Sequence, residues 1–208
     1  MPTLEKYLTP NTDYFVSLVA QSKGKFIFCT EVKGWQKNNN DKYLIPFDLV
    51  TVKVKRDETV QQALARLCEE EIGDPITEIT NMKQGQTAIM TDLTFIFETI
   101  EGEKSPPAYI VISKKATSSK VNSEAYSNTF VYSGKTDAGD LKSANMQALF
   151  KIPPVLLKKI MAGNYTIGEG IKEGMEVIDP KVQIPEDSVF EPRIDVSEFM
   201  RFLKESVR

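Results

Sequence analysis

Residues 58–73 constrain the fold of this chain more than any other stretch. Their apolar side chains recur at intervals of three and four, the spacing that places them on one face of an α-helix. These residues are Val60, Leu64, Leu67, Cys68 and Ile72. Gly73 supplies a stop at the C-terminal end, and Pro75 cannot continue the helix. The sequence therefore predicts an amphipathic helix that buries one face against the rest of the protein.

Three glutamates, Glu69, Glu70 and Glu71, crowd the last turn of this predicted helix. The helix dipole places partial negative charge there, which disfavours each exposed carboxylate by roughly 0.3–1 kcal/mol. A cation nearby would offset this cost. Arg66, four residues before Glu70, is one candidate, and a hard divalent metal such as Mg²⁺, Mn²⁺ or Ca²⁺ is another. The alternative is a solvated face at a frayed helix end, which is what most charge runs are.

The order of charged residues in this stretch resembles the Nudix box. That family pattern is a Gly, five residues, Glu, seven residues, Arg-Glu, an aliphatic, one residue, Glu-Glu, one residue, Gly and an aliphatic. The positions that match are Glu58, Arg66, Cys68, Glu70, Glu71 and Gly73. Three positions depart from the pattern. Val52 replaces the leading Gly, Leu67 replaces the Glu after the Arg, and Asp74 replaces the final aliphatic.

The resemblance implies a Nudix-like α/β/α sandwich with a mixed β-sheet. It also implies metal-dependent hydrolysis of a nucleoside diphosphate linked to another group. On this interpretation Glu70 and Glu71 hold Mg²⁺ or Mn²⁺, and Glu58 orients Arg66 at the catalytic site. In the family, the glutamate that follows the arginine is a metal ligand and often the general base. Leu67 at that position implies weak metal binding and weak or lost hydrolysis, and a glutamate placed there is expected to strengthen both.

Two residues outside the box are further candidates. Nudix enzymes often recruit a carboxylate from elsewhere, so Glu98, in a predicted strand, is the candidate replacement for the missing base, with Asp92 and Glu101 as weaker ones. Trp35, the only tryptophan, lies on a polar loop before the box and is a candidate to stack on a nucleobase. The alternatives are a glutamate that faces solvent and a tryptophan partly buried at the edge of a sheet.

The chain contains no histidine. This excludes Ser-His-Asp and Cys-His catalysis as well as histidine-based zinc sites. Acid–base chemistry would have to come from carboxylates, Lys, Tyr or metal-bound water. The net charge is −3, so no strongly basic field indicates RNA or DNA as a partner.

A length of 208 residues with 41% hydrophobic content is enough for one sizeable core. The sequence has no apolar run long enough to span a bilayer and no leader typical of a signal peptide. Cys29 and Cys68 lie in apolar segments and are expected to be reduced thiols in the core. These features predict a cytoplasmic protein without a membrane segment.

Patterns along the chain predict the remaining elements. Predicted strands cover 14–20, 25–32, 43–54, 92–100, 108–113 and 129–132. Predicted helices cover 141–150, 153–161 and 196–205, and Asp57 and Ser197 are the expected N-caps of the box helix and the last helix. We expect a loop at 114–128 and a turn at 137–140. The domain organisation is an N-terminal arm at 1–13, a Nudix-like domain at 14–161 and a C-terminal extension at 162–208 with a closing helix.

Two functions remain open from the sequence. One is a pyrophosphohydrolase. The other is a Nudix-fold binding module, without turnover, for a nucleotide-type small molecule, an RNA segment or a protein. Leu67, Val52 and the replacement of the family's Pro-Gly-Gly turn by residues 46–48 favour the module. An unrelated α/β domain with a chance match is the third interpretation. The apolar face of the closing helix is expected to dock on the domain or on a second copy of the chain.

Overall fold

The computed structural model describes residues 2–10, 12–31, 35–72, 78–79, 85–114, 126–136, 141–142 and 146–206. The helical elements are η1 (Leu4–Tyr7), α1 (Val60–Leu67), the π turn Cys68–Ile72, α2 (Pro154–Met161), α3 (Ile167–Lys172) and α4 (Ile194–Ser206). The strands are β1 (Thr12–Ser22), β2 (Lys25–Thr30), β3 (Gln36–Lys37), β4 (Tyr43–Phe47), β5 (Val50–Lys53), β6 (Glu78–Ile79), β7 (Gln86–Met90), β8 (Phe95–Thr99), β9 (Tyr109–Lys114), β10 (Tyr126–Lys135), β11 (Ala148–Ile152), β12 (Glu176–Ile178) and β13 (Val189–Pro192).

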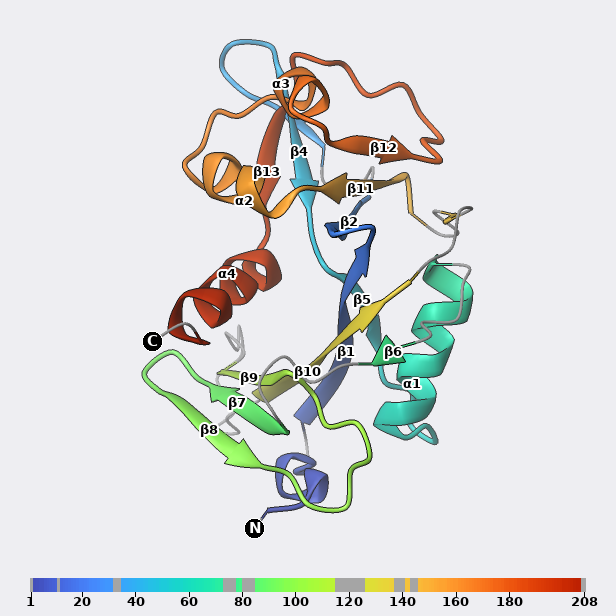
Figure 1. The fold of residues 1–208 in the computed structure, drawn as a ribbon, viewed down its shortest axis with the longest axis vertical. Coiled ribbons are helices and arrows are strands. Elements are labelled where there is room, and N and C mark those ends of the chain that lie inside the picture. Colours follow the sequence, from blue (N-terminus) through green and yellow to red (C-terminus); the bar gives the residue numbers. More distant parts are fainter. Residues whose placement is uncertain are drawn as a thin grey trace, which may run out of the picture.

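The long strand β1 organises a ten-stranded mixed sheet (Figure 1). It pairs in parallel with β10 on one side along ten positions. On its other side it pairs antiparallel with β5 near its middle and with β2 near its end. The strand order is β12-β11-β2-β1-β10-β9-β7-β8, and β6 pairs with β10 beside this path. A separate sheet has the order β13-β4-β3. The expected mixed sheet is confirmed.

The two faces of the large sheet carry separate apolar cores, because alternate residues of each strand point to opposite faces. Val16, Leu18 and Ala20 of β1 belong to the core under α1. Val19, between them, belongs to the core under α2 and α4. Helices therefore cover both faces, and the predicted α/β/α sandwich is confirmed (Figure 1).

The core under α2 and α4 is rich in aromatic rings. Phe28 of β2 lies edge-on to Phe47 of β4 at 5.3 Å, and Phe199 of α4 packs against Phe26 at 5.1 Å between ring centroids. Phe190 of β13 continues this packing against Phe47. These contacts join the small sheet and the last helix to the large sheet. Edge-on ring pairs of this kind contribute about 0.5–1.5 kcal/mol beyond the buried area.

One predicted helix and one predicted N-cap in the C-terminal half are wrong, whereas the closing helix predicted at 196–205 is confirmed as α4. Residues 141–150 were expected to be helical, but residues 148–152 form β11, which pairs with β2 and β12. A short apolar run fits a buried strand as well as a helix, and here the two partner strands decided the outcome. α4 begins at Ile194, so Ser197 lies inside it and its hydroxyl donates to the carbonyl of Arg193 at 3.3 Å. The helix predicted at 153–161 is confirmed as α2.

Both ends of the chain contribute to the packed structure. Leu4 and Tyr7 of η1 are buried in the core under α1, and Asn128 of β10 donates its amide to the carbonyl of Tyr7 at 2.7 Å. At the other end, β12 adds an edge strand to the large sheet and β13 pairs in parallel with β4.

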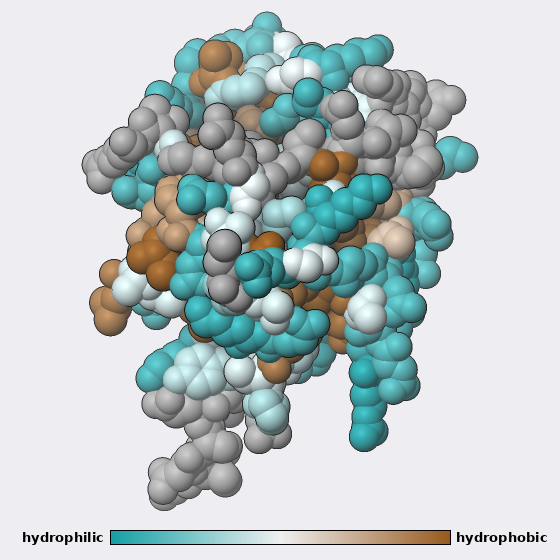
Figure 2. Space-filling view, turned by 60° about the horizontal axis from the view of Figure 1, so that its bottom comes forward, coloured by the Kyte–Doolittle hydropathy of each residue, from teal (hydrophilic) through white to brown (hydrophobic). Residues whose placement is uncertain are grey.

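Most apolar side chains that stay exposed are single residues on different elements, such as Leu93, Val155 and Ile194. Figure 2 shows hydrophilic residues over much of one face, with hydrophobic residues in several separated groups. None of the helices in the described part of the chain is long and apolar enough to cross a membrane. The stop expected at Gly73, the turn at 137–140 and most of the loop at 114–128 lie outside the described residues.

Candidate functional site

The predicted amphipathic helix is present, but its cap and its last turn differ from expectation. Thr59, not Asp57, is the N-cap: its hydroxyl accepts from the backbone of Gln62, and the Gln62 side chain accepts from the backbone N–H of Thr59. This reciprocal pair is a capping box. After Leu67 the helix widens into the π turn Cys68–Ile72. A π turn has more residues per turn than an α-helix, so the glutamates rotate away from the register that the sequence alone suggests.

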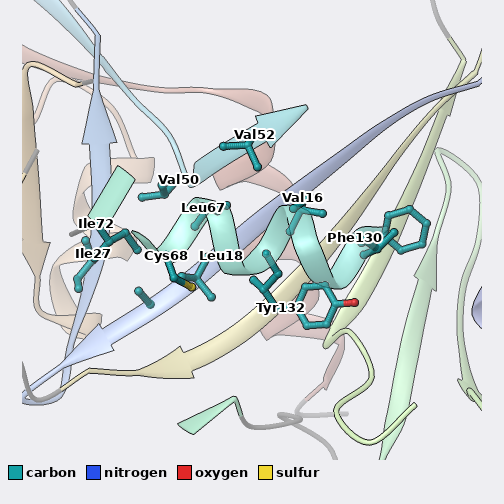
Figure 3. Packing of buried hydrophobic residues seen from close by; sticks show 14 of the residues in the cluster. Val16, Leu18, Ile27, Val50, Val52, Leu67, Cys68, Ile72, Phe130 and Tyr132 are labelled. Carbon is teal, nitrogen blue, oxygen red and sulfur yellow. The ribbon is translucent and has the colours of Figure 1, made fainter. Parts of the chain in front are cut away.

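The apolar face of α1 packs against β1 and β5. Leu67 has no exposed surface and lies among apolar side chains of these strands (Figure 3). Cys68 and Ile72, in the π turn, join the same core. The position that holds a carboxylate in the box pattern is thus filled here by a core side chain.

Glu58 and Arg66 form the most complete ion pair of the box. Arg66 donates from Nε to Glu58 Oε1 at 2.8 Å and from Nη2 to Oε2 at 2.9 Å. The side chains are only 15% and 12% exposed for Arg66 and Glu58, respectively. Arg66 also donates to the carbonyl of Lys53 at the end of β5. The hydrogen bonds from Arg66 and from the backbone of Lys55 lower the pKa of Glu58 to about 2. Glu58 thus holds the guanidinium of Arg66 in place, and the role expected for this pair at a catalytic site stays a prediction.

The hydrogen bonds to Glu58 raise the pKa of Arg66, and the negative charges of Glu70 and Glu71 both raise it further. The Glu70 side chain is 54% exposed, and its Oε2 is 3.8 Å from Nη1 of Arg66. Burial raises the pKa of the Cys29 thiol, and the negative charges of Asp48, Glu31 and Glu71 raise it further. Glu71 is thus close enough to both Cys29 and Arg66 for its charge to shift their pKa values.

These donors do not fit the three-carboxylate metal site that the resemblance implies. Leu67 lies in the core, and Glu70 extends into solvent beside Arg66. Within the described ranges, no group of three or more Asp, Glu, Cys or His side chains is arranged to hold a metal ion. The roles predicted for Glu70 and Glu71 as ligands of Mg²⁺ or Mn²⁺ therefore remain predictions, and no chemical step below depends on a metal.

A pocket of about 310 Å³ opens beside Cys29. It is formed by the end of β2, the junction of β4 and β5, and the residue before α4. Its walls are Cys29, Thr30, Glu31, Pro46, Asp48, Leu49, Thr51, Met146 and Arg193. The backbone N–H of Arg193 donates to the carbonyl of Phe47 at 3.1 Å, which places Arg193 beside Asp48. The pocket thus combines a cation, carboxylates and hydroxyls within a small volume, the composition of a binding site for a polar ligand.

Asp48 is the most perturbed acid of this pocket. Burial raises its pKa to about 7, with a further contribution from the charge of Asp195, while a hydrogen bond from the backbone of Leu49 and the charge of Arg193 act in the opposite direction. Burial also raises the pKa of Asp195, in the first turn of α4, although a hydrogen bond from Thr51 opposes it. Such perturbed acids in a cleft are typical of functional sites. The sequence offered one indication of this pocket, since Asp48 is a carboxylate among the apolar residues of the predicted strand at 43–54.

Of the two candidates outside the box, Glu98 does not line this pocket, and Trp35 contacts one residue of its wall. The carboxylate of Glu98, on β8, binds Lys6 Nζ at 3.0 Å and the hydroxyl of Tyr7. β8 is four strands from β1 in the sheet order, whereas α1 packs on β1. Trp35 is partly buried, and its Nε1 donates to Thr30 Oγ1, a residue of the pocket, at 3.2 Å. The proposed roles of both residues remain predictions.

Comparisons with known proteins give distant likenesses. No protein-family model matches the chain, and no curated protein matches it. Among solved structures, a MutT protein from Methanosarcina mazei Go1 aligns over 95% of this chain and 96% of its own, with 16% identity and a TM-score of 0.46. The E. coli ORF135 protein aligns over 67% of this chain and 71% of its own (16% identity, TM-score 0.36). The E. coli dihydroneopterin triphosphate pyrophosphohydrolase aligns over 71% and 84% (11% identity, TM-score 0.41).

Proposed function

We propose that this chain is a Nudix-type binding module that holds a nucleotide-type small molecule in the pocket beside Cys29 and hydrolyses it slowly or not at all. The observation that carries the proposal is the position of Leu67. In the box pattern this position provides a metal ligand and often the base. Here it provides a fully buried apolar side chain instead.

The composition of the pocket supports a ligand with both anionic and hydrogen-bonding groups. Arg193 at its wall is suited to a phosphate oxygen, because a guanidinium binds oxyanions through paired N–H donors. Asp48, Thr30 and Thr51 offer oxygens to the N–H groups of a base. Arg66 also joins α1 to the end of β5 through the carbonyl of Lys53, and β5 contributes Thr51 to the pocket wall.

Titration with nucleoside mono-, di- and triphosphates tests the binding. Trp35 donates to Thr30 in the pocket wall, so its fluorescence should change on binding, and calorimetry gives an independent affinity. Arg193→Ala should weaken binding of the tightest ligand about tenfold or more, because a charge-assisted hydrogen bond contributes roughly 1.5–3 kcal/mol. Lys204→Ala, on an exposed turn of α4, is the matched control. If Arg193→Ala leaves the nucleotide affinity unchanged, the ligand binds outside this pocket.

One observation favours hydrolysis as the second candidate function. A general base works best when its pKa lies near the working pH, and Asp48 meets this condition with a pKa of about 7. Chromatography of the same nucleotides after incubation with Mg²⁺ distinguishes the two functions. Rapid turnover that falls about 10²–10⁴-fold in Asp48→Asn would establish a hydrolase that uses a base outside the box. Binding without turnover supports the module.

A further inference from the structure

A second cavity lies at α1 and is separate from the pocket beside Cys29. It has a volume of about 370 Å³ and is formed by α1, the π turn, β6, β10 and the segment after β8. Its walls are Gln61, Leu64, Ala65, Cys68, Glu69, Ile79, Glu103, Lys104, Ser105 and Tyr132. The volume falls in the range of small-molecule sites, and it exceeds the roughly 150 Å³ of an engineered cavity that binds benzene. Its walls share no residue with the first pocket.

Tyr132 of β10 provides the polar group of this cavity. Its side chain is 1% exposed, and its buried hydroxyl has no hydrogen-bond partner in the described part of the structure. A buried hydroxyl without a partner costs roughly 1–3 kcal/mol, and a ligand that forms a hydrogen bond with it would recover this cost. Burial raises the pKa of Tyr132, and the charge of Glu103 raises it further. Tyr132 and Glu103 both line the wall of this cavity. Figure 3 shows the Tyr132 ring beside α1.

The charged residues of the rim restrict the class of ligand. Glu69 and Glu103 provide two negative charges and Lys104 provides one positive charge. Gln61 Nε2 donates to Glu103 Oε2 at 2.7 Å, which joins α1 to the segment after β8 and closes that end of the cavity. A net negative rim disfavours an anionic ligand. The oxygens of Glu103 and Tyr132 are acceptors for a donor group, while Leu64, Ala65, Cys68 and Ile79 provide an apolar wall.

We propose that this cavity binds a small neutral aromatic molecule that carries an N–H or O–H donor, of which indole and phenol are the simplest. The ring would lie against the apolar side of α1, and its polar hydrogen would point toward Tyr132 and Glu103. This site is independent of the proposed nucleotide pocket. Either assignment can fail without the other.

Titration of the isotopically labelled full-length chain with indole, followed by amide NMR, tests the proposal. We expect saturable shifts centred on Ala65, Cys68 and Tyr132. Ala65 is exposed on α1, so Ala65→Trp should preserve the fold while its ring occupies the mouth of the cavity. This variant should abolish saturation. Tyr132→Phe should weaken binding about 3- to 10-fold, the usual effect of one hydrogen bond.

Tyr109→Phe is the matched control. Tyr109 is also fully buried with an unpartnered hydroxyl, but it lies in the core on the other face of the sheet. Its variant should bind indole as the original chain does. Shifts that do not saturate, saturation that survives Ala65→Trp, or equal weakening by the two tyrosine variants would overturn the proposal. If Tyr132→Phe fails to fold, the exposed Ala65→Trp variant still decides the result.

Discussion

Arg66 donates two hydrogen bonds to the carboxylate of Glu58, eight residues earlier in the chain. One partner belongs to α1 and the other to the turn that leads into it. The same guanidinium binds the carbonyl of Lys53, so one side chain joins the helix, its entry turn and strand β5. Both side chains are largely buried. The arrangement makes the pair a structural tie at the start of the box as well as a candidate part of the site.

Glu58→Gln should lower the free energy of unfolding at pH 7 by about 1–3 kcal/mol, because it weakens two charge-assisted hydrogen bonds. The pKa of Glu58 falls from its usual 4.5 to about 2 in the folded chain. Its contribution is therefore complete above pH 4.5 and disappears as the pH falls through 2. Denaturant unfolding across this pH range should show that the difference in stability between the original chain and Glu58→Gln disappears in acid. Asp41→Asn, which breaks an exposed pair with Lys37, should change stability by less than about 0.5 kcal/mol.

Asp48→Asn should produce the opposite dependence on pH. The folded chain holds the Asp48 proton up to about pH 7, whereas the unfolded chain releases it near 3.8. Stability of the original chain should therefore fall as the pH rises from 4 to 7, and the variant should lose much of that slope. Three pKa units set an upper limit of about 4 kcal/mol for the gain of the variant at pH 8. Asp187→Asn, at an exposed position, is the control. If stability changes with pH in the same way in the original chain and in Asp48→Asn, the pKa of Asp48 is not raised.

Leu67→Glu should destabilise the fold by roughly 3 kcal/mol or more, because it buries a carboxylate among apolar side chains. We expect millimolar Mg²⁺ not to recover this loss, since position 67 lies in the core whereas the Glu70 side chain is exposed beside Arg66. Leu67→Met, similar in volume, should cost less than about 1.5 kcal/mol. Thermal unfolding in Mg²⁺ and in chelator measures the stability of both variants. If Mg²⁺ restores the stability of Leu67→Glu and the variant also gains nucleotide hydrolysis, the interpretation as a metal-dependent enzyme is supported.

Thr59→Ala should cost about 1 kcal/mol through loss of the capping box at α1. Asp57→Ala, at the position that the sequence suggested as the cap, should change stability by less than about 0.5 kcal/mol. Urea unfolding of the two variants side by side compares them directly. A larger loss for Asp57→Ala would mean that the helix begins earlier than the structure shows.

Glu98→Gln should loosen the N-terminal segment and leave any nucleotide hydrolysis unchanged. Its carboxylate binds Lys6 and Tyr7 of η1, and these bonds lower the pKa of Glu98. The amides of residues 4–8 should exchange faster with deuterium, while those of α1 keep their protection. A fall in turnover without faster exchange at η1 would instead support Glu98 as a base.

Local patterns in the sequence determined the elements whose residues repeat regularly. The stripe of α1, the alternation in β5, and the apolar face of α4 each follow from a period that one segment can display alone. They also predict a mixed α/β chain, whereas its two cores, one on each face of the sheet, are a finding of the structure. The correct cap of α1 was available too, because Thr59 and Gln62 have the spacing of a capping box.

Only the tertiary structure decided the properties that depend on distant neighbours. Residues 148–152 became a strand because β2 and β12 offer hydrogen-bond partners on both sides. The partners of Glu98 come from η1, at the far end of the sequence. Asp48 acquires a raised pKa because folding buries it and brings Asp195 to the same place. Burial and electrostatic fields are sums over the surrounding atoms, and no periodicity within one segment contains that information.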